Sequence, residues 1–409
     1  TNTEDASNTL YLATSYTDTV GNTGPEATTA NYAVETLAPT ISSVTAGWGT
    51  SLNATEDNSA GTVTVVTSGA ENGQTVTVTL NSTNYTGTVS DNSTSVTIAA
   101  SGLQALTNGS SYTLTTNVSD AAGNAATVNT GTSFTYDRTP PSISGAVAIT
   151  SATGIQNNLL NAGDNVSVTV TFSENSPVTG TPQLTLAVGE DNHTADYTSS
   201  GSGATTKVFK YTIQAGDTDS NGISIRANAL DNNSSTIRDR ASNIATDLTH
   251  SAVSDNSSVK VDTTLPTVSV AITGEDGIQN SFLNAEDNVS VTATFSETVI
   301  VDNSSGNPTI TLVVGSDNRT ATYTSGDNST RLVFRYMIKA TGTSGENDDD
   351  GISMDADALN SDIITIRDAA GNIATDLTHD AVPDNSSVKV DTIPPAVDNF
   401  TMSDTELKI

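Results

Sequence analysis

Two long segments of this 409-residue chain are copies of one another, and this repeat limits the folds that the chain can adopt. NVSVTVTFSE, ending at Glu174, recurs as NVSVTATFSE, ending at Glu297. TIRDRASNIATDLTH at 236–250 returns as TIRDAAGNIATDLTH at 365–379, and DNSSVKVD closes both copies. The period is about 125 residues, which is the size of a whole domain and far longer than one turn of a solenoid. We therefore expect a tandem array of similar domains.

The array divides at short acidic joints. We expect one shorter unit over 38–137 and two full units over 138–262 and 263–391. Residues 1–37 have the pattern of the last two strands of a truncated unit, and 392–409 that of the first strand of a further unit. Because no basic-then-apolar leader opens the chain, we expect it to be an excerpt of a longer protein. No apolar run approaches the roughly 18 residues that a membrane helix needs, so we expect no membrane insertion in this segment.

Within a unit, apolar and polar residues alternate. In NVSVTVTFS one face carries Val166, Val168, Val170 and Phe172, while Ser and Thr occupy the other. In KVFKYTI, Phe209, Tyr211 and Ile213 share a face. This period of two is typical of an antiparallel sheet with one buried face. About seven such strands per unit, separated by Asn, Asp and Gly turns, predict an all-β array of immunoglobulin-like (Ig-like) β-sandwiches, with one helical turn at 101–109.

The composition excludes several classes of function. The formal charge is −32 with only 14 Lys and Arg, so a nucleic acid or an anionic membrane is not an expected partner. The chain has no Cys, which rules out disulfides and thiolate-bound zinc. It also lacks G-x-S-x-G and H-E-x-x-H motifs. We expect a structural protein and no enzyme, hence no catalytic residues.

The joints carry a family resemblance. YDRTPP (136–141), VDTTLP (261–266) and VDTIPP (390–395), together with DAAGN at 120–124 and 368–372, resemble the bacterial Ig-like tandem repeats of giant surface adhesins and biofilm-associated proteins. The resemblance implies an extracellular stalk on a cell surface, stiffened by calcium. Two places depart from the pattern, since the first joint reads VETLAP and one corner reads DRASN (239–243).

The sandwich topology independently predicts a metal site at each junction. The end of the second strand, the corner before the last strand and the incoming joint should meet at the pole that faces the preceding unit. Two carboxylates about 4 Å apart repel by about 4 kcal/mol at an effective dielectric near 20, so three of them require a cation. Ca²⁺ fits best, because it takes six to eight oxygen ligands in irregular geometry. The predicted ligands are Asp120, Asp137, Glu174, Asp239, Asn243, Asp262, Glu297, Asp368 and Asn372.

A simpler interpretation of the corner is also open. DAAGN is a β-turn sequence in which the Asp caps its own backbone and the Gly or the Asn is left-handed. The two interpretations are compatible with each other.

A second pair of candidate metal loops lies inside the full units. Asp217, Asp219 and Asn221 precede a Gly in GDTDSNGISI, and Glu346, Asp348 and Asp350 precede a Gly in GENDDDGISM. Both match the first half of a calcium loop with oxygen donors at alternate positions. Strand-like ISI and ISM follow, so a helical EF-hand is not expected. The alternative is a solvated acidic turn.

Three further features have simple structural interpretations. His250 and His379 occupy equivalent places, and we interpret them as partly exposed strand-end residues with no catalytic role. Trp48 is interpreted as a packing residue. Asn-x-Ser/Thr sequons are frequent, which predicts either a glycosylated surface protein or only a chain rich in Asn, Ser and Thr; they include Asn81, Asn84, Asn92, Asn165, Asn256, Asn288 and Asn385.

Three functions therefore stay open. The first is an extracellular adhesin stalk whose partners are the neighbouring repeats of the same chain and whose joints are rigidified by Ca²⁺. The second is a subunit of a self-assembling filament, sheath or S-layer, in which copies of the chain add strands to one another. The third is a module that binds a glycan or a protein.

Overall fold

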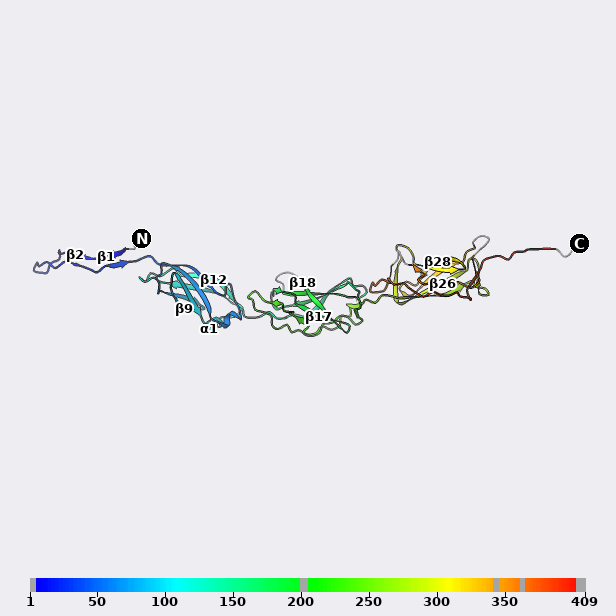
Figure 1. Cartoon of the computed structure of the whole chain (residues 1–409). Helices are drawn as coiled ribbons and strands as arrows, with labels where there is room; N and C mark the ends of the chain where they lie inside the picture. The colour runs from blue at the N-terminus through cyan, green and yellow to red at the C-terminus, as the bar shows by residue number, and fades with distance from the viewer. Residues whose placement is uncertain (1–4, 199–204, 341–345, 361–364, 402–409) are drawn as a thin grey trace.

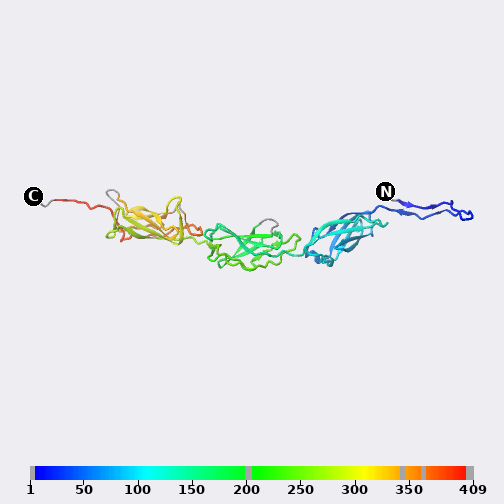
Figure 2. The ribbon, with the colours of Figure 1, turned by 180° about the vertical axis from the view of Figure 1, so that it is seen from behind.

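The chain forms three β-sandwiches that lie end to end, preceded by a narrow ribbon and followed by an extended segment (Figures 1 and 2). The computed structural model describes residues 5–198, 205–340, 346–360 and 365–401. The predicted terminal units therefore lie partly outside the described residues. In the described part of the chain, no helix has the length and apolar character that crossing a membrane requires.

The N-terminal ribbon consists of two short antiparallel strand pairs. β1 (Asp5–Asn8) pairs with β4 (Tyr32–Val34), and β2 (Tyr11–Leu12) pairs with β3 (Ala27–Thr28). A bridge between Thr17 and Thr23 closes its far end. Its apolar side chains are exposed because no second layer covers them within the described residues.

The first sandwich has two sheets. One has the order β10-β7-β5 and the other the order β6-β12-β11-β8-β9. Their bounds are β5 Thr40–Ala46, β6 Ser51–Leu52, β7 Gly61–Ser68, β8 Thr75–Leu80, β9 Thr83–Thr88, β10 Ser93–Ile98, β11 Ser111–Val118 and β12 Asn129–Tyr136. The expected helical turn is present as α1 (Ala100–Gln104), and a short 3₁₀ turn, η1, spans Glu56–Asn58.

The second sandwich combines a large sheet with much shorter strands. The large sheet has the order β13-β15-β19-β18-β17-β21, a smaller one the order β14-β23-β20, and β16 pairs with β22. Their bounds are β13 Ala148–Thr153, β14 Leu159–Leu160, β15 Asn165–Thr171, β16 Val178–Thr179, β17 Gln183–Val188, β18 Asp191–Thr198, β19 Thr206–Thr212, β20 Thr218–Asp219, β21 Leu230–Asp231, β22 Thr236–Ile237 and β23 Lys260–Asp262.

The third sandwich repeats this plan. Its large sheet has the order β24-β26-β29-β28-β27-β31, with β32 also pairing with β26, and its small sheet the order β25-β33-β30. Their bounds are β24 Val268–Asp276, β25 Phe282–Leu283, β26 Asn288–Asp302, β27 Thr309–Val314, β28 Asp317–Ser325, β29 Ser329–Met337, β30 Asn347–Asp348, β31 Leu359–Asn360, β32 Thr365–Arg367 and β33 Lys389–Asp391.

One strand pair in each sandwich is parallel, although the sequence pattern predicted antiparallel sheets. β6 runs parallel to β12, β14 to β23, and β25 to β33. In each case the first strand of the sandwich (β5, β13 or β24) belongs to one sheet. The short strand that follows it (β6, β14 or β25) pairs with the last strand of the sandwich in the other sheet. This crossing pairs an edge of the second sheet and brings the outgoing joint to a fixed position at the pole.

Each sandwich has its own hydrophobic core, and the period-two prediction is confirmed. Val166, Val168 and Val170 are fully buried in the second core, together with Phe209. Trp48 is buried in the first core and packs edge-on against Phe134 at 5.3 Å, as a packing residue should.

Candidate metal centre

The five-residue corner before the last strand of a unit has one conformation wherever it occurs in the described chain. In the second sandwich, the carboxylate of Asp239 accepts hydrogen bonds from the backbone N–H and the Nδ2 of Asn243, at 2.8 and 2.7 Å. In the third, Asp368 accepts the same two bonds from Asn372 at 2.8 and 2.7 Å. The β-turn interpretation is therefore confirmed. Each carboxylate oxygen keeps a second lone pair, so the turn leaves a metal interaction open.

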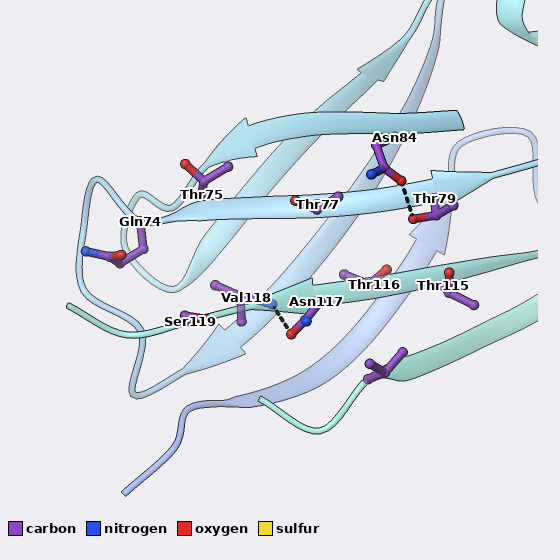
Figure 3. A pocket seen from close by; sticks show the side chains of 11 residues that line it. Gln74, Thr75, Thr77, Thr79, Asn84, Thr115, Thr116, Asn117, Val118 and Ser119 are labelled. Atoms are coloured by element: carbon purple, nitrogen blue, oxygen red, sulfur yellow. Dashed lines mark hydrogen bonds between the residues drawn. The ribbon is translucent and has the colours of Figure 1, made fainter. Parts of the chain in front are cut away.

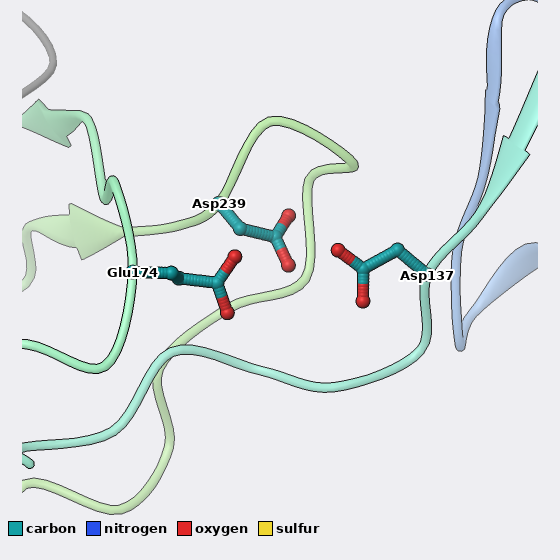
Figure 4. A group of neighbouring side chains, drawn as sticks. All are labelled: Asp137, Glu174 and Asp239. Carbon is teal, nitrogen blue, oxygen red and sulfur yellow. The ribbon is translucent and has the colours of Figure 1, made fainter. Parts of the chain in front are cut away.

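At the first seam, the junction of the first and second sandwiches, three acidic side chains converge (Figure 4). Asp137 comes from the joint, Glu174 from the segment after β15, and Asp239 from the corner. One oxygen of each lies within 4.8 Å of the others. Asp239 is 3% exposed and the other two are half-buried.

At the second seam, the junction of the second and third sandwiches, the same arrangement recurs. Asp262, Glu297 and Asp368 each place an oxygen within 4.8 Å of the other two. Asp368 is 1% exposed. In the described residues, these two seams hold the groups of three acids close enough to share an ion.

The seam carboxylates have no positive partner. Among the described residues, no Lys, Arg or His forms an ion pair with them, and neither glutamate accepts a hydrogen bond. Burial, followed by the charges of Asp368 and Asp262, raises the pKa of Glu297 to about 7. Burial, followed by Asp137 and Asp239, also raises the pKa of Glu174. Each seam is thus a pocket of uncompensated negative charge made of hard oxygen donors.

The corner asparagines join the modules directly. Asn243 Nδ2 donates to the main-chain oxygen of Asp137 at 2.8 Å, and its Oδ1 accepts the N–H of Ala54 at 2.9 Å. Asn372 Nδ2 donates in the same way to the main-chain oxygen of Asp262 at 2.8 Å. These amides hold the joint against the corner, which is a positioning task.

Asp120 lies in the matching corner of the first sandwich, but its surroundings differ. It accepts two hydrogen bonds from Asn124, whose Nδ2 reaches the main-chain oxygen of Glu35 at 3.2 Å. Glu71 is turned toward the backbone N–H of Ala121 at 2.8 Å. Asp120 is therefore not part of a three-acid group among the described residues, and its metal role stays a prediction.

The three predicted donors of the Asp217 loop make separate hydrogen bonds within the protein. Asp217 accepts hydrogen bonds from Tyr211 and from the backbone of Gln214, at 2.7 and 2.8 Å, with His193 3.4 Å away. Asp219 accepts backbone N–H groups from Gly189 and Gly222, at 2.8 and 2.6 Å. Asn221 donates outward to Asp255.

The second copy of this loop follows the same plan, with Arg319 in the place of His193. Glu346 accepts hydrogen bonds from Tyr336 and from Arg319 Nε, and Asp348 accepts the N–H groups of Gly315 and Gly351. Asp350 lies beside Asp348, where it contributes to a raised Asp348 pKa whose main cause is burial. Glu346 and Asp348 are buried and hydrogen-bonded within the protein, whereas Asp350 is exposed, so only part of the loop is a solvated turn. Metal binding by the loop stays a prediction.

The two repeated histidines hold adjacent loops together. His250 Nε2 accepts the N–H of Ala229 at 2.8 Å, and His379 Nε2 accepts that of Leu359 at 3.3 Å. His379 is buried and neither residue lies in a strand, so the strand-end prediction was wrong in detail.

An uncharged groove lies on the first sandwich over β8 and β11 (Figure 3). It has a volume of about 580 Å³ and is lined by hydroxyl and amide side chains that include Thr77, Thr79, Thr115 and Asn117. No aromatic side chain lines it. Glycan binding, like self-assembly and glycosylation, stays a prediction.

The sequence reasoning missed a set of amides that cross the seams. Asn53 Nδ2 donates to the main-chain oxygen of Ala241 at 2.9 Å. Gln156, Asn157 and Asn161 make comparable contacts with the third sandwich. The recurrence of GIQN at 154–157 and 277–280 was the available signal, but a repeat by itself does not indicate what a turn contacts.

The fold and the seams together define an extended array of Ig-like β-sandwiches with an acidic centre at each junction between sandwiches. No protein-family model and no curated protein matches the chain. Solved structures do match. One match is a structure from work on the host cell surface retention of a 1.5-MDa bacterial ice-binding adhesin. The match covers 87% of this chain and 98% of the adhesin chain at 18% identity, with a TM-score of 0.43.

Two further matches are also bacterial adhesins. A Ca²⁺-stabilised adhesin with which an Antarctic bacterium binds ice matches 92% of this chain and 80% of that chain at 23% identity, with a TM-score of 0.39. An Ig-like domain of the M. primoryensis ice-binding adhesin is 33% identical over 23% of this chain and 96% of that domain, with a TM-score of 0.19. The chain is thus similar to Ig-like repeats of large bacterial adhesins. Each TM-score lies below 0.5, and the function proposed for this chain rests on its own geometry.

Proposed function

We propose that the chain is a structural segment of an extracellular adhesin stalk at a cell surface, in which Ca²⁺ binds at the seams and makes neighbouring sandwiches one stiff rod. The observation that carries this proposal is the three-acid group, which occurs at both seams and has no positive partner among the described residues. Three carboxylates from three segments repel unless an ion joins them. An ion at this point would be bound by both modules at once.

The donor set favours calcium over other divalent ions. The three-acid groups hold carboxylates and no His or Cys among the described residues, which argues against a typical zinc site. Asp137, Glu174, Asp262 and Glu297 are half-buried, so water can complete an irregular shell of six to eight ligands. Mg²⁺ demands stricter octahedral geometry. In this proposal Asn243 and Asn372 position the joint, and the carboxylates bind the ion.

The proposal also fits the chain's charge. With a formal charge of −32, an ion-free array repels itself, and calcium at each seam reduces that repulsion. Extracellular calcium modules bind with dissociation constants of roughly 10⁻⁴–10⁻³ M, and we expect the seams to fall in this range. The partners are the neighbouring repeats of the same chain, and the role is mechanical with no catalysis. We keep 38–137, 138–262 and 263–391 as the proposed domain boundaries.

Calorimetric titration of the full chain with Ca²⁺ tests the proposal. We expect Glu174→Gln to weaken or abolish Ca²⁺ binding at the first seam. Glu297→Gln should do the same at the second seam. The matched control is Glu275→Gln, an exposed glutamate near the far end of β24 and outside both three-acid groups, which should bind as the parent does. Small-angle scattering should show a fixed maximum dimension with Ca²⁺ and a broader ensemble after chelation. Titrations that are unchanged in both seam variants would refute the proposal.

A further inference from the structure

The turn at the far pole of the second sandwich presents a set of amides to the third. Asn157 Nδ2 donates to the main-chain oxygen of Ala369 at 2.8 Å, and Asn161 Nδ2 donates to that of Ala370 at 3.0 Å. Gln156 Nε2 also reaches Ala370, at 3.4 Å, while its Oε1 accepts a bond from Arg367 at 2.8 Å. We call residues 154–161 the amide turn. Its partners are main-chain carbonyls and one arginine, and none of them is a carboxylate of the second seam.

The amide side chains lie directly against the glycine of the corner that they meet. Gly371 has φ +94°, and a Cβ added there would lie 2.2 Å from Gln156 Nε2 and 3.1 Å from Asn161 Nδ2. Gly123, at the same place in the first sandwich, has φ +90° but no atom within 4 Å of such a Cβ. The backbone conformation is therefore shared, and the packing against a preceding amide turn is specific to the second seam.

We propose that the amide turn is a docking surface that recognises the backbone of a D-x-x-G-N corner and fixes the orientation of the next sandwich without any ion. It deepens the proposed function, since it rests on the seams being the joints of a stalk, but it does not require that calcium bind. In this arrangement the amides set the angle between the modules, and the acidic centre adds an ion-dependent lock. The second seam then keeps its orientation in the absence of calcium.

The same surface is preformed at the far pole of the third sandwich. There GIQN recurs, Gln279 and Phe282 exchange the backbone bonds that Gln156 and Leu159 exchange, and Asn284 N donates to Asp287 at 2.8 Å as Asn161 N does to Asp164 at 2.9 Å. The partner that fits this turn is the D-x-x-G-N corner of a following repeat of the same kind.

The first seam is built with fewer direct contacts. The amide turn is replaced there by the segment before η1, where Asn53 Nδ2 and the N–H of Ala54 each make one hydrogen bond to the corner, both at 2.9 Å. The corner carries Ser242 at φ +74° where the third sandwich has Gly371. We therefore expect the ion-free first seam to hold its angle less firmly than the second.

The test measures the spread of distances between the second and third sandwiches in the full chain. Because the chain has no Cys, Thr212→Cys and Met337→Cys place one spin label at the same position of each sandwich. The docking variant is Gln156→Ala with Asn157→Ala and Asn161→Ala. The matched control is Gln279→Ala with Asn280→Ala and Asn284→Ala, which changes the same turn where it meets no corner among the described residues. Asn157 and Asn280 have φ of 52° and 50°, so the backbone strain of the substitutions is equal.

In chelator, we expect the docking variant to lose the narrow distance distribution of the parent and the control variant to keep it. Equal distributions in the two variants without calcium would overturn the inference. The outcome is independent of the calcium proposal. If calcium does not change the distance distribution of the parent while the docking variant still gives a broader one, calcium does not fix the seam and the amide docking is supported. If the distribution narrows only when calcium is added, in the parent and in both variants alike, calcium fixes the seam and the amide docking is wrong.

Discussion

Glu297 and Asp368 lie far apart in the sequence, yet their carboxylate oxygens come within 4.8 Å of each other and of Asp262. Glu297 belongs to β26, and Asp368 directly follows β32. β32 pairs with β26, which brings the two elements to the same end of the sandwich. Since no basic side chain of the described residues pairs with this group, the pair is destabilising whenever both acids are ionised and no cation is bound.

This pair predicts an unusual pH dependence for the calcium-free protein. The folded pKa of Glu297 is about 7, against an ordinary value of 4.5, so the folded state binds more protons than the unfolded state between these values. Unfolding free energy therefore falls as pH rises from 4.5 to 7, by an amount on the order of 1–3 kcal/mol for a partly exposed group. Thermal melts in chelator across this range measure it.

Glu297→Gln should flatten that dependence because the glutamine does not titrate. With saturating Ca²⁺ the slope should reverse, since the ion binds the deprotonated group. A melting temperature that rises with pH in chelator, in the parent protein, would contradict the assigned electrostatics of the second seam.

Replacing the positioning asparagine should weaken calcium binding without removing a carboxylate. Asn243→Ala deletes the bonds that hold Asp239 and the main chain of Asp137 in place. Loss of such an outer partner typically costs 10- to 100-fold in metal affinity, and we expect roughly this loss at the first seam. The matched control is Asn124→Ala, which deletes the same bonds in a corner without a three-acid group among the described residues. Calorimetry that shows equal calcium affinity in both variants would speak against the positioning role.

Much of the fold and of the seam could be predicted, the fold from the local alternation of apolar residues and the seam from the strand order of a β-sandwich. Alternation placed Val168 and Phe209 in the core, and strand order alone brought Glu174 and Asp239 to one pole. The calcium-loop spacing at Asp217 was less informative. Its partners Tyr211 and His193 lie on other strands, and a loop motif carries no information about what packs against it.

The docking contacts were beyond prediction for a related reason. Asn157 and Asn161 look like ordinary turn residues, and turn sequences favour Asn whether or not its side chain has a partner. Their partners are main-chain oxygens of the next sandwich, whose positions depend on the angle between the modules. That angle is a property of the assembled array.

A methyl group at the corner glycine should distinguish the corner that the amide turn contacts from the corner of the first sandwich, where a Cβ would meet no atom within 4 Å. Gly371→Ala and Gly123→Ala both place a Cβ at a left-handed position, which costs roughly 1–2 kcal/mol in either case. Only at Gly371 does the new atom also collide with Gln156 and Asn161. We expect a greater loss of stability in Gly371→Ala, and a broader distance distribution across the second seam. Equal melting temperatures and unchanged distances would show that Gln156 and Asn161 can move away from the new methyl group without loss of stability.

The Glu346 loop offers a last prediction, which separates internal ion pairing from metal binding. Glu346 is almost fully buried, and Arg319 Nε donates to its Oε1 at 2.6 Å. Arg319→Ala leaves a buried carboxylate without a positive partner, and we expect a loss of about 3 kcal/mol or more in the stability of the third sandwich. Arg335→Ala is the matched control, because its pair with Asp276 at 3.9 Å is exposed on both sides and contributes less than about 1 kcal/mol. Urea unfolding, monitored through hydrogen exchange of the β29 amides, measures the stability of the third sandwich in both variants. The calcium test uses Arg319→Ala combined with Glu297→Gln, which removes a carboxylate of the second seam. If calcium restores the stability of this double variant, the loop binds the metal. Without such rescue, Glu346 stabilises its own sandwich through Arg319 and Tyr336, and Asp348 does so through the backbone N–H groups of Gly315 and Gly351.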